Sequence, residues 1–252
     1  MTENVQAKPV IEMRDITKIY HIGGEEVRAL DHATLTIREG EFVAIIGPSG
    51  SGKSTFLRSL NLLEKPTAGK ILFNGADITG LSVTERARLG IGFAFQQPVR
   101  FKGLYVRDLL RLAAGRTLAT DEACAYLAEV GLCAMDYIDR EIDARLSGGE
   151  LKRIEIATLI ARAPQLYLFD EPEAGIDLWS FHNLIRVFQK MRDEKNGTIL
   201  IISHQERIIE IADRIIVVSN GTITGTGTKD EILPGLLKES NACRYYREEV
   251  RI

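Results

Sequence analysis

Apolar residues fall into short runs along the chain, and most of these runs have the length of a buried strand. Residues 42–46 and 198–202 are two such runs, and each is followed by glycine or a polar residue. Between the runs, apolar residues recur every three to four positions, which is typical of helices that bury one face. This alternation of strand and helix patterns predicts an α/β fold with a parallel sheet.

Turn and cap signals separate the expected elements. Asn74-Gly75 and Asn220-Gly221 are hairpin signals, and Ser82 precedes Glu85 at the spacing of a helix capping box. The expected strands are residues 10–20, 33–37, 42–46, 70–75, 90–95, 166–169, 198–202, 214–219 and 222–227. The expected helices are residues 56–63, 106–114, 121–130, 151–162 and 205–212, with a short one after 82, a long one ending near 191 and a last one after 228.

One segment interrupts the α/β pattern. Residues 99–145 have helical periodicity and no strand signal, so they predict an inserted helical subdomain. Residues 1–98 and 146–237 then form the α/β core. That core includes an N-terminal antiparallel β-subdomain, because residues 22–28 have the composition of a hairpin connection. Residues 238–252 form a charged tail, and the whole chain is expected to be a single domain.

Composition narrows the classes of function. The 252 residues are 45% hydrophobic and 27% charged, which is ordinary for a globular protein, and the net charge of −3 argues against a general nucleic-acid-binding surface. No apolar run approaches the ~20 residues that a membrane-spanning helix needs, and no signal-peptide pattern begins the chain. The scattered Cys124, Cys133 and Cys243 predict neither a disulfide framework nor a metal cluster. We therefore expect a cytoplasmic protein that neither binds nucleic acid nor inserts into a membrane.

The strongest chemical signal follows the strand at residues 42–46. It is the pattern G-x-x-x-x-G-K-[ST], a phosphate-binding loop, between a predicted strand and a predicted helix. Its glycines let consecutive backbone N–H groups converge on phosphate oxygens. Lys53 would reach the β- and γ-phosphates, and the Ser54 hydroxyl would ligate Mg²⁺, so the loop predicts a site for Mg-ATP. The residues expected to bind the nucleotide here are Gly47, Pro48, Ser49, Gly50, Ser51, Gly52, Lys53, Ser54 and Thr55.

Polar residues also follow two other predicted strands. Asp170 and Glu171 end the strand at residues 166–169, which is the Walker B arrangement. In it Asp170 would hold Mg²⁺, and Glu171 could orient and polarise the attacking water. His204 follows the strand at residues 198–202, at the edge where active-site loops leave a parallel sheet. We therefore expect these side chains to share one site with the phosphate loop.

Two further features are open to more than one interpretation. Ser147 and Glu150 have the spacing of a capping box, which is a sufficient structural reason for both residues. The intervening Gly148 and Gly149 leave the helix end open to an anion, which a capping box does not explain. Tyr20 ends the first strand and could stack on an adenine ring, although a half-buried strand tyrosine would look the same.

Taken in order, these motifs resemble those of the ATP-binding-cassette (ABC) ATPases, from about residue 10 to residue 237. The resemblance implies a P-loop NTPase core, ATP and Mg²⁺ as cofactors, and Tyr20 as the adenine-stacking aromatic. Gln96 becomes the lid glutamine that contacts Mg²⁺ and water, beside Ser54 and Asp170 as metal ligands. Together with Glu171 and His204, which would sense the γ-phosphate, Gln96 completes the expected catalytic set.

The same resemblance implies a dimer. Ser147, Gly148 and Gly149 would be the signature motif, and residues 173–177 would contact a second cassette. In a head-to-tail homodimer, or in a paired cassette, each signature closes over the ATP of the partner. An isolated chain would then hold half of each active site.

The branch of the family is less clear from the motifs. Residues 46–51 and 28–31 resemble lipoprotein-release and macrolide-export ATPases. Residues 94–98, 147–155 and 173–177 look more like the Suf-system ATPase of iron–sulfur cluster assembly, although that family usually has asparagine at Ser49.

Our main hypothesis is an ATPase that drives a conformational change in a partner, either a soluble Suf-like scaffold or a transporter. The alternative is a nucleotide-binding subunit that acts on a separate membrane permease, which would hold the chain peripherally at the membrane. A stand-alone regulatory or nucleic-acid-linked ABC protein is a third, weaker reading, because the chain is acidic and has one cassette.

Two acidic residues distinguish the Suf-like motifs. Glu155 should lie one turn beyond Leu151, and Glu173 borders the dimer loop. We expect both carboxylates near the ATP interface, where their negative charge repels triphosphate unless a cation compensates it. The dimer would then be weak until a partner holds two cassettes together. The alternative is that both are solvated residues with no such role.

Overall fold

The computed structural model describes residues 7–143, 145–194 and 197–240, with side chains up to residue 234. Its central sheet has six strands in the order β12-β11-β3-β10-β9-β6. Neighbouring strands are parallel except at the β12 edge, so the predicted parallel α/β core is confirmed. The strands are β3 (Phe42–Ile46), β6 (Ile91–Ala94), β9 (Leu166–Asp170), β10 (Thr198–Ile202), β11 (Arg214–Ser219) and β12 (Thr222–Gly227).

The central strands are apolar throughout because both faces of the sheet are covered. In β3, Val43 and Ile45 belong to the core on one face, and Phe42 and Ala44 belong to the core on the other. The same alternation continues in β9 and β10. The polar residues after these strands are therefore left at the edge of a sheet that is rigidly buried on both sides.

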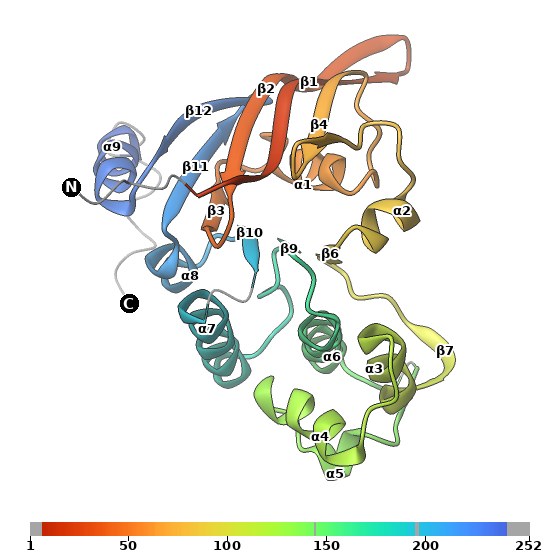
Figure 1. Cartoon of the computed structure of the whole chain (residues 1–252). Helices are drawn as coiled ribbons and strands as arrows, with labels where there is room; N and C mark the ends of the chain where they lie inside the picture. Colours follow the sequence, from red (N-terminus) through yellow and green to blue (C-terminus); the bar gives the residue numbers. More distant parts are fainter. Residues whose placement is uncertain (1–6, 144, 195–196, 241–252) are drawn as a thin grey trace, which may run out of the picture.

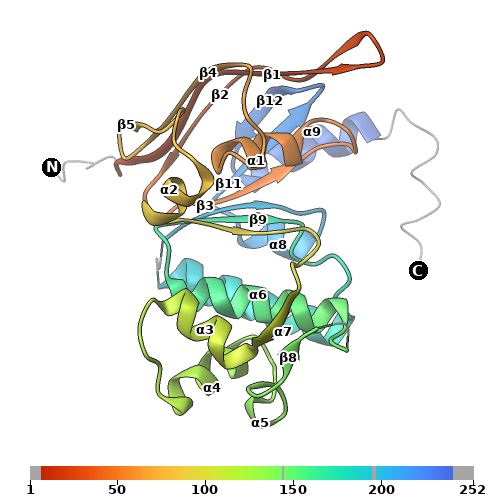
Figure 2. The ribbon, with the colours of Figure 1, turned by 90° about the vertical axis from the view of Figure 1, so that its right-hand side faces the viewer.

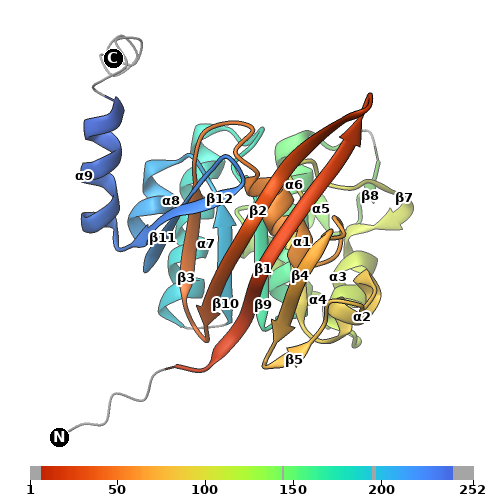
Figure 3. The same ribbon diagram turned by 90° about the horizontal axis from the view of Figure 1, so that it is seen from above.

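A second, antiparallel sheet packs over the first, with strand order β2-β1-β4-β5 (Figure 3). Its long hairpin turns at Gly23 and Gly24, which both have positive φ, and the Asn74-Gly75 turn lies where the sequence predicted it. The predicted N-terminal antiparallel sheet is thus present, with longer strands than expected. They are β1 (Pro9–Ile22), β2 (Glu25–Arg38), β4 (Ala68–Phe73) and β5 (Ala76–Asp77).

Helices lie on both faces of the central sheet (Figures 1 and 2). Between the two sheets lies α1 (Lys53–Leu60), which buries Phe56, Leu57 and Leu60 completely. On the opposite face of the central sheet lie α6 (Gly148–Arg162) and α7 (Leu178–Asp193). The shorter helices of the core are α2 (Val83–Arg88), α8 (Glu206–Ile211) and α9 (Lys229–Ser240).

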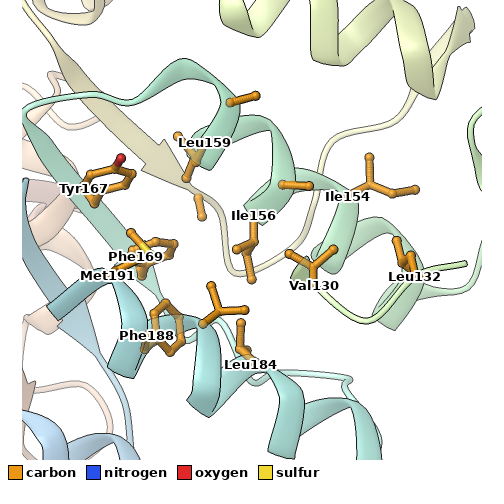
Figure 4. Close-up of a cluster of buried hydrophobic side chains, with 14 of the residues drawn as sticks. Val130, Leu132, Ile154, Ile156, Leu159, Tyr167, Phe169, Leu184, Phe188 and Met191 are labelled. Carbon is orange, nitrogen blue, oxygen red and sulfur yellow. The ribbon is translucent and has the colours of Figure 1, made fainter. Parts of the chain in front are cut away.

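Aromatic packing ties the strand before Asp170 to the helices below it. Phe169 of β9 meets Phe188 of α7 edge to face, with ring centroids 5.0 Å apart, and both rings are fully buried (Figure 4). Ile156 of α6 belongs to the same cluster. Such a pair adds about 0.5–1.5 kcal/mol beyond its burial, so the end of β9 is firmly held.

The helix that follows the phosphate loop is held at its far end by a buried arginine. Arg86 of α2 is fully buried and donates to the carbonyl oxygens of Ser59 (3.0 Å) and Leu60 (2.9 Å), which end α1. Burial lowers the pKa of this guanidinium to about 10, and it stays charged at neutral pH. Helix α2 itself starts at the predicted capping box of Ser82 and Glu85.

Residues 99–145 contain both predicted helices and one feature that the sequence did not predict. The elements are β7 (Phe101–Tyr105), α3 (Val106–Ala114), α4 (Thr120–Glu129), α5 (Ala134–Tyr137) and β8 (Glu141–Ile142). Strands β7 and β8 pair across the ends of this segment, so the expectation of no strand here was wrong. β7 contains Gly103 at positive φ and its partner is two residues long, so no alternating pattern could develop. The subdomain boundaries themselves stay a prediction.

Two further observations concern membrane-spanning helices and cysteines. Within the described part of the chain, no helix has the length and apolar character to cross a membrane. Cys124 and Cys133 are free thiols on a half-buried and an exposed position, and Cys243 lies outside the described residues.

Candidate nucleotide-binding and catalytic site

The phosphate loop joins β3 to α1 in a conformation that requires glycine at two positions. Gly47 has φ 149°, and a Cβ there would lie 2.0 Å from the Val218 carbonyl oxygen. Gly52 has φ 99°, and a Cβ would lie 2.4 Å from the Ala29 carbonyl oxygen. These backbone contacts cannot give way as a flexible side chain could. The loop is therefore a tight backbone cradle that opens at the N-terminus of α1, as an anion site does.

Lys53 lies inside this cradle. Its Nζ donates to the carbonyl oxygens of Gly47 (2.8 Å) and Pro48 (2.9 Å), and the residue is 6% exposed. Burial lowers the pKa of this ammonium, while the nearby charges of Glu171 and Asp170 oppose the shift. Phosphate oxygens would give the ammonium a charged partner in place of neutral carbonyls, so the cradle fits a triphosphate.

A hydroxyl and a carboxylate meet at the start of α1. Ser54 Oγ donates to Asp170 Oδ1 at 3.1 Å, and Asp170 is fully buried at the end of β9. The other oxygen, Oδ2, accepts from Arg58 Nη2 at 3.0 Å. A serine hydroxyl and a carboxylate are the hard oxygen ligands that Mg²⁺ prefers, so these residues could hold the expected metal ion. Arg58 was not predicted from the sequence, although it lies one helical turn after Ser54.

The three residues expected to be catalytic converge at the same sheet edge. Gln96 Nε2 donates to Glu171 Oε2 at 2.8 Å, and His204 Nε2 lies 3.7 Å from Glu171 Oε1. They follow β6, β9 and β10, which are adjacent in the sheet, so their side chains leave it side by side. Glu171 has φ 47°, an uncommon backbone conformation of the kind found at functional sites.

A cavity of about 340 Å³ unites the phosphate loop with these residues. It is bounded on one side by the loop and on the other by Gln96, Glu171 and His204. A cation, a hydroxyl that could ligate Mg²⁺, a carboxylate that could act as the base and an imidazole thus border one space, and phosphoryl transfer to water uses groups of these kinds. The lining residues are Ala29, Ser49, Gly50, Ser51, Gly52, Lys53, Ser54, Thr55, Gln96, Glu171 and His204.

Tyr20 lies beside this cavity and does not line it. Its ring is half-buried, with Lys18 Nζ 4.7 Å from the ring centroid. Burial raises the pKa of the Tyr20 hydroxyl, and the side chains of Thr55 and Glu64 also act on it. The ring is therefore next to the last residue of the phosphate loop, where an adenine ring could reach it. This position is compatible with stacking and with a structural tyrosine.

The signature residues are not brought to the cavity of their own chain. Ser147 is the N-cap of α6 and forms the predicted capping box with Glu150. Ser147 and Gly148 are exposed, and a Cβ on Gly149 would lie 3.1 Å from the Gly175 carbonyl oxygen. The signature and the loop at residues 173–177 therefore form one surface, separate from the phosphate loop.

Glu155 does not place an uncompensated negative charge at the ATP interface, because it is turned inward beside the ammonium of Lys152. Its Oε1 accepts from the Phe95 N–H at 3.1 Å, and Oε2 lies 3.8 Å from Nζ of the fully buried Lys152. Burial raises the pKa of Glu155 to about 7, and Lys152 lowers it in part. The alternative of a solvated residue is wrong, because the side chain is only 15% exposed.

Glu173 is also turned inward. Its Oε1 accepts from Ser203 Oγ at 2.7 Å and from the His204 N–H at 3.2 Å. Burial raises the pKa of this carboxyl above its ordinary value. Glu173 therefore links the loop at residues 173–177 to the loop that carries the histidine. No sequence pattern shows this contact, since the two segments are 30 residues apart.

Comparison with known proteins shows which family the chain resembles. The ABC transporter family model matches residues 30–174. The uncharacterized ABC transporter ATP-binding protein MJ0035 of Methanocaldococcus jannaschii is 39% identical over 229 residues, which are 88% of this chain and 90% of that protein. The methionine import ATP-binding protein MetN 1 of Shouchella clausii is 36% identical, with 87% of this chain covered. The sulfate/thiosulfate import ATP-binding protein CysA 2 of Rhizobium meliloti is also 36% identical, with 81% of this chain covered.

The matches differ in extent. This chain spans nearly all of MJ0035, but 65% of the MetN protein and 57% of the CysA protein. One similar solved structure is the dimeric ATP-binding cassette MJ0796 in a post-hydrolysis state bound to ADP and Pi. It aligns with a TM-score of 0.78 and 28% sequence identity, and the alignment covers 86% of this chain and 98% of that one. The chain therefore belongs to the ABC transporter family, whose ATP-binding proteins are ATP hydrolases.

Proposed function

We propose that this chain hydrolyses Mg-ATP as the nucleotide-binding subunit of an ABC transporter and drives a separate membrane-spanning permease. The observation that carries the proposal is the convergence of Gln96, Glu171 and His204 on the phosphate-loop cavity. The names of the methionine and sulfate import relatives support the transporter part. The solved cassette with bound ADP and Pi supports the choice of nucleotide.

Binding of the triphosphate would use the backbone first. The N–H groups of the phosphate loop and the N-terminus of α1 receive the phosphate oxygens, and Lys53 turns from its loop carbonyls to the β- and γ-phosphates. Ser54 and Asp170 would hold Mg²⁺ together with Gln96. When bound, this ion neutralises the charge that develops on the transferred phosphoryl group.

Hydrolysis would use the three residues at the sheet edge. Glu171 is positioned to accept a proton from the attacking water, as a general base does. Gln96, which donates to Glu171 in this structure, would hold that water together with the carboxylate. His204 lies on the other side of Glu171, where its imidazole would contact the γ-phosphate.

The active site would be completed by a second copy. The signature at the start of α6 is exposed and does not line the cavity of its own chain, so a second cassette in head-to-tail orientation could supply it. The capped N-terminus of α6 would then face the γ-phosphate of the partner's ATP. The dimeric cassette structures of MJ0796 support this arrangement.

The permease would dock in an apolar groove between the core and the helical segment. This groove has a volume of about 420 Å³, and Leu112 at its side is 66% exposed. An amphipathic segment of a membrane protein fits such a surface, and its binding would hold the chain at the membrane. We call it the docking groove; it is lined by Ala87, Phe93, Phe95, Val99, Phe101, Leu109, Leu112, Ala113, Ile142, Ile154, Glu155, Thr158, Leu159 and Arg162.

The soluble Suf-like scaffold gains no support from these relatives, whose names refer to transporters. The experiment that separates the two partners is purification of the chain from native cells with its companions, followed by ATPase assays. We expect stimulation by a co-purified integral membrane protein in bilayers. Stimulation by a soluble companion without lipid would overturn the proposal in favour of the scaffold.

A matched pair of variants locates the contact. Leu112→Asp should abolish stimulation and leave the basal ATPase rate unchanged, because it charges the docking groove outside the catalytic cavity. Ile22→Asp makes the same change at the exposed tip of the β1–β2 hairpin, 63% exposed, and should keep stimulation. Equal loss in both variants would show that the groove is not the docking surface.

A further inference from the structure

The segment that carries Gln96 is held from below by two charged residues of α6. We call residues 95–98 the glutamine loop. Lys152 has no exposed side-chain surface, and its Nζ donates to the carbonyl oxygens of Phe95 and Gln96, the latter at 3.2 Å. Glu155, one turn further along α6, accepts from the Phe95 N–H at 3.1 Å. One backbone group from each of three successive peptides is thus held by these two side chains.

This arrangement determines where the Gln96 side chain can go. Lys152 holds the carbonyl groups of the two peptides that flank the Gln96 Cα, and Glu155 holds the peptide before them, so the side chain has little freedom beyond its own rotamers. Its Nε2 then lies 2.8 Å from Glu171 Oε2. Neither Lys152 nor Glu155 lines the cavity, and Glu155 is linked to it through its hydrogen bond to the glutamine loop. The Lys152 ammonium also interacts electrostatically with the carboxylates of Asp170, Glu171 and Glu173.

The pair also borders the docking groove. Glu155 and its neighbour Ile154 line the groove together with Phe95, the residue that both charged side chains hold. The glutamine loop therefore lies between the groove and the catalytic cavity, and the Lys152–Glu155 pair is its support from α6.

A stabilising role alone does not account for the pair. Removing an ammonium and a carboxylate from water is costly, and apolar residues of similar size often replace a buried ion pair with no loss of stability. Here the polar atoms are directed to peptide groups of the glutamine loop, while Oε2 of Glu155 has no hydrogen-bond partner among the described residues. The contacts fix the position of a loop, which apolar substitutes could not do.

We infer that Lys152 and Glu155 are positioning residues for Gln96. The inference rests on the proposed hydrolysis of ATP, and it is tested on the purified chain. Misplacement of a reacting group by about 1 Å can cost ~10²-fold in rate, so loss of either support should be visible in kcat.

The test is a double-mutant cycle between Glu155 and Gln96. We expect Glu155→Leu to lower kcat by about 10- to 100-fold with the KM for ATP unchanged within about twofold, because the phosphate loop is not altered. Gln96→Ala should lower kcat by a similar factor. Adding Glu155→Leu to Gln96→Ala should then have little further effect, because both changes act through one side chain.

Two further variants protect the test against misfolding. Glu155→Gln keeps an oxygen for the Phe95 N–H and should recover most of the kcat that Glu155→Leu loses. Lys152→Met combined with Glu155→Leu removes both buried charges, and its thermal unfolding should match that of the wild type while kcat stays low. Circular dichroism and calorimetric ATP binding serve as the checks on folding.

Each outcome of these experiments bears either on the positioning role or on the proposed function. Additive losses in the cycle, or the same kcat in Glu155→Gln and Glu155→Leu, would overturn the positioning role. A raised KM with unchanged kcat would overturn it as well, since the pair would then serve nucleotide binding. Absence of ATPase activity in the wild-type chain, also after mixing with its partner, would instead refute the proposed function.

Discussion

Replacing Glu171 by glutamine is the most informative single change in the catalytic cavity. The new side chain is isosteric, and its amide oxygen can still accept from Gln96 Nε2, which lies 2.8 Å from Oε2 in the wild type. The carboxylate is 25% exposed at the sheet edge and outside the core clusters, so the fold should not change. What is lost is the negative charge and the ability to take a proton.

The expected magnitude follows from that loss. A positioned general base contributes about 10²- to 10⁴-fold in rate, or about 3–5 kcal/mol of activation free energy. We expect Glu171→Gln to lower kcat by this factor and to keep ATP affinity, because the phosphate loop and Lys53 remain. Closure would persist while hydrolysis stalls, so the variant should also accumulate as an ATP-bound dimer.

Phosphate release, calorimetric ATP binding and size-exclusion chromatography with ATP measure these three quantities. Glu210→Gln is a matched control, since it makes the same chemical change on α8, where the side chain is 47% exposed and pairs with Lys229. It should behave as the wild type. Steady-state turnover of Glu171→Gln within a few-fold of the control would refute the role of Glu171 as the base.

Three further predictions follow from the same geometry. Lys53→Ala should weaken ATP binding by about tenfold or more in calorimetry, since a charge-assisted hydrogen bond is worth ~1.5–3 kcal/mol; unchanged affinity would contradict the placement of the ammonium. Gly47→Ala should lower unfolding stability by about 1–3 kcal/mol, because its Cβ would lie 2.0 Å from a carbonyl oxygen of β11, whereas Gly24→Ala meets no atom within 4 Å and should cost less. Trp179, the single tryptophan, is 84% exposed and lies two residues after the loop at residues 173–177, which we expect at the dimer interface. Its emission should therefore shift to the blue in the ATP-bound dimer of Glu171→Gln, and an unshifted spectrum of a proven dimer would place it outside that interface.

Local pattern predicts the core strands and places the phosphate loop, Asp170 and Glu171 at their ends. The phosphate loop, Asp170 and Glu171 follow long apolar strands, and the strands of a parallel sheet deliver their ends to one edge. The positions of Gln96 and His204 beside Glu171 follow from the same topology once the strand order is known. The sequence shows the strands but not their order, which is known only from the structure.

The partners of charged side chains could not be predicted where they lie far away in the sequence. Lys152 and Glu155 are three residues apart on α6, which reads as an ordinary exposed helix pair, yet both face the glutamine loop. Glu173 pairs with Ser203 only because β9 and β10 are neighbours. The two-stranded sheet of β7 and β8 was not predicted either. Its strands are too short to show an alternating pattern, and they pair only in the folded chain.

The central claim is that ATP is hydrolysed in a site shared by two copies of this chain. Ser147→Arg should block the signature; it loses a helix cap worth about 1 kcal/mol, and the exposed position accommodates the longer side chain. Lys53→Ala blocks the phosphate loop, and each variant alone should be inactive. In a mixed dimer with twofold arrangement, one of the two sites combines an intact loop with an intact signature.

The most direct measurement is the ATPase rate of an equimolar mixture of these two variants. If half of the dimers are mixed and each has one working site, the rate should recover to about a quarter of the wild-type value. Two tags on the variants and sequential affinity purification establish that mixed dimers are present. No recovery in proven mixed dimers would contradict the account, because each chain would then need both elements in its own site.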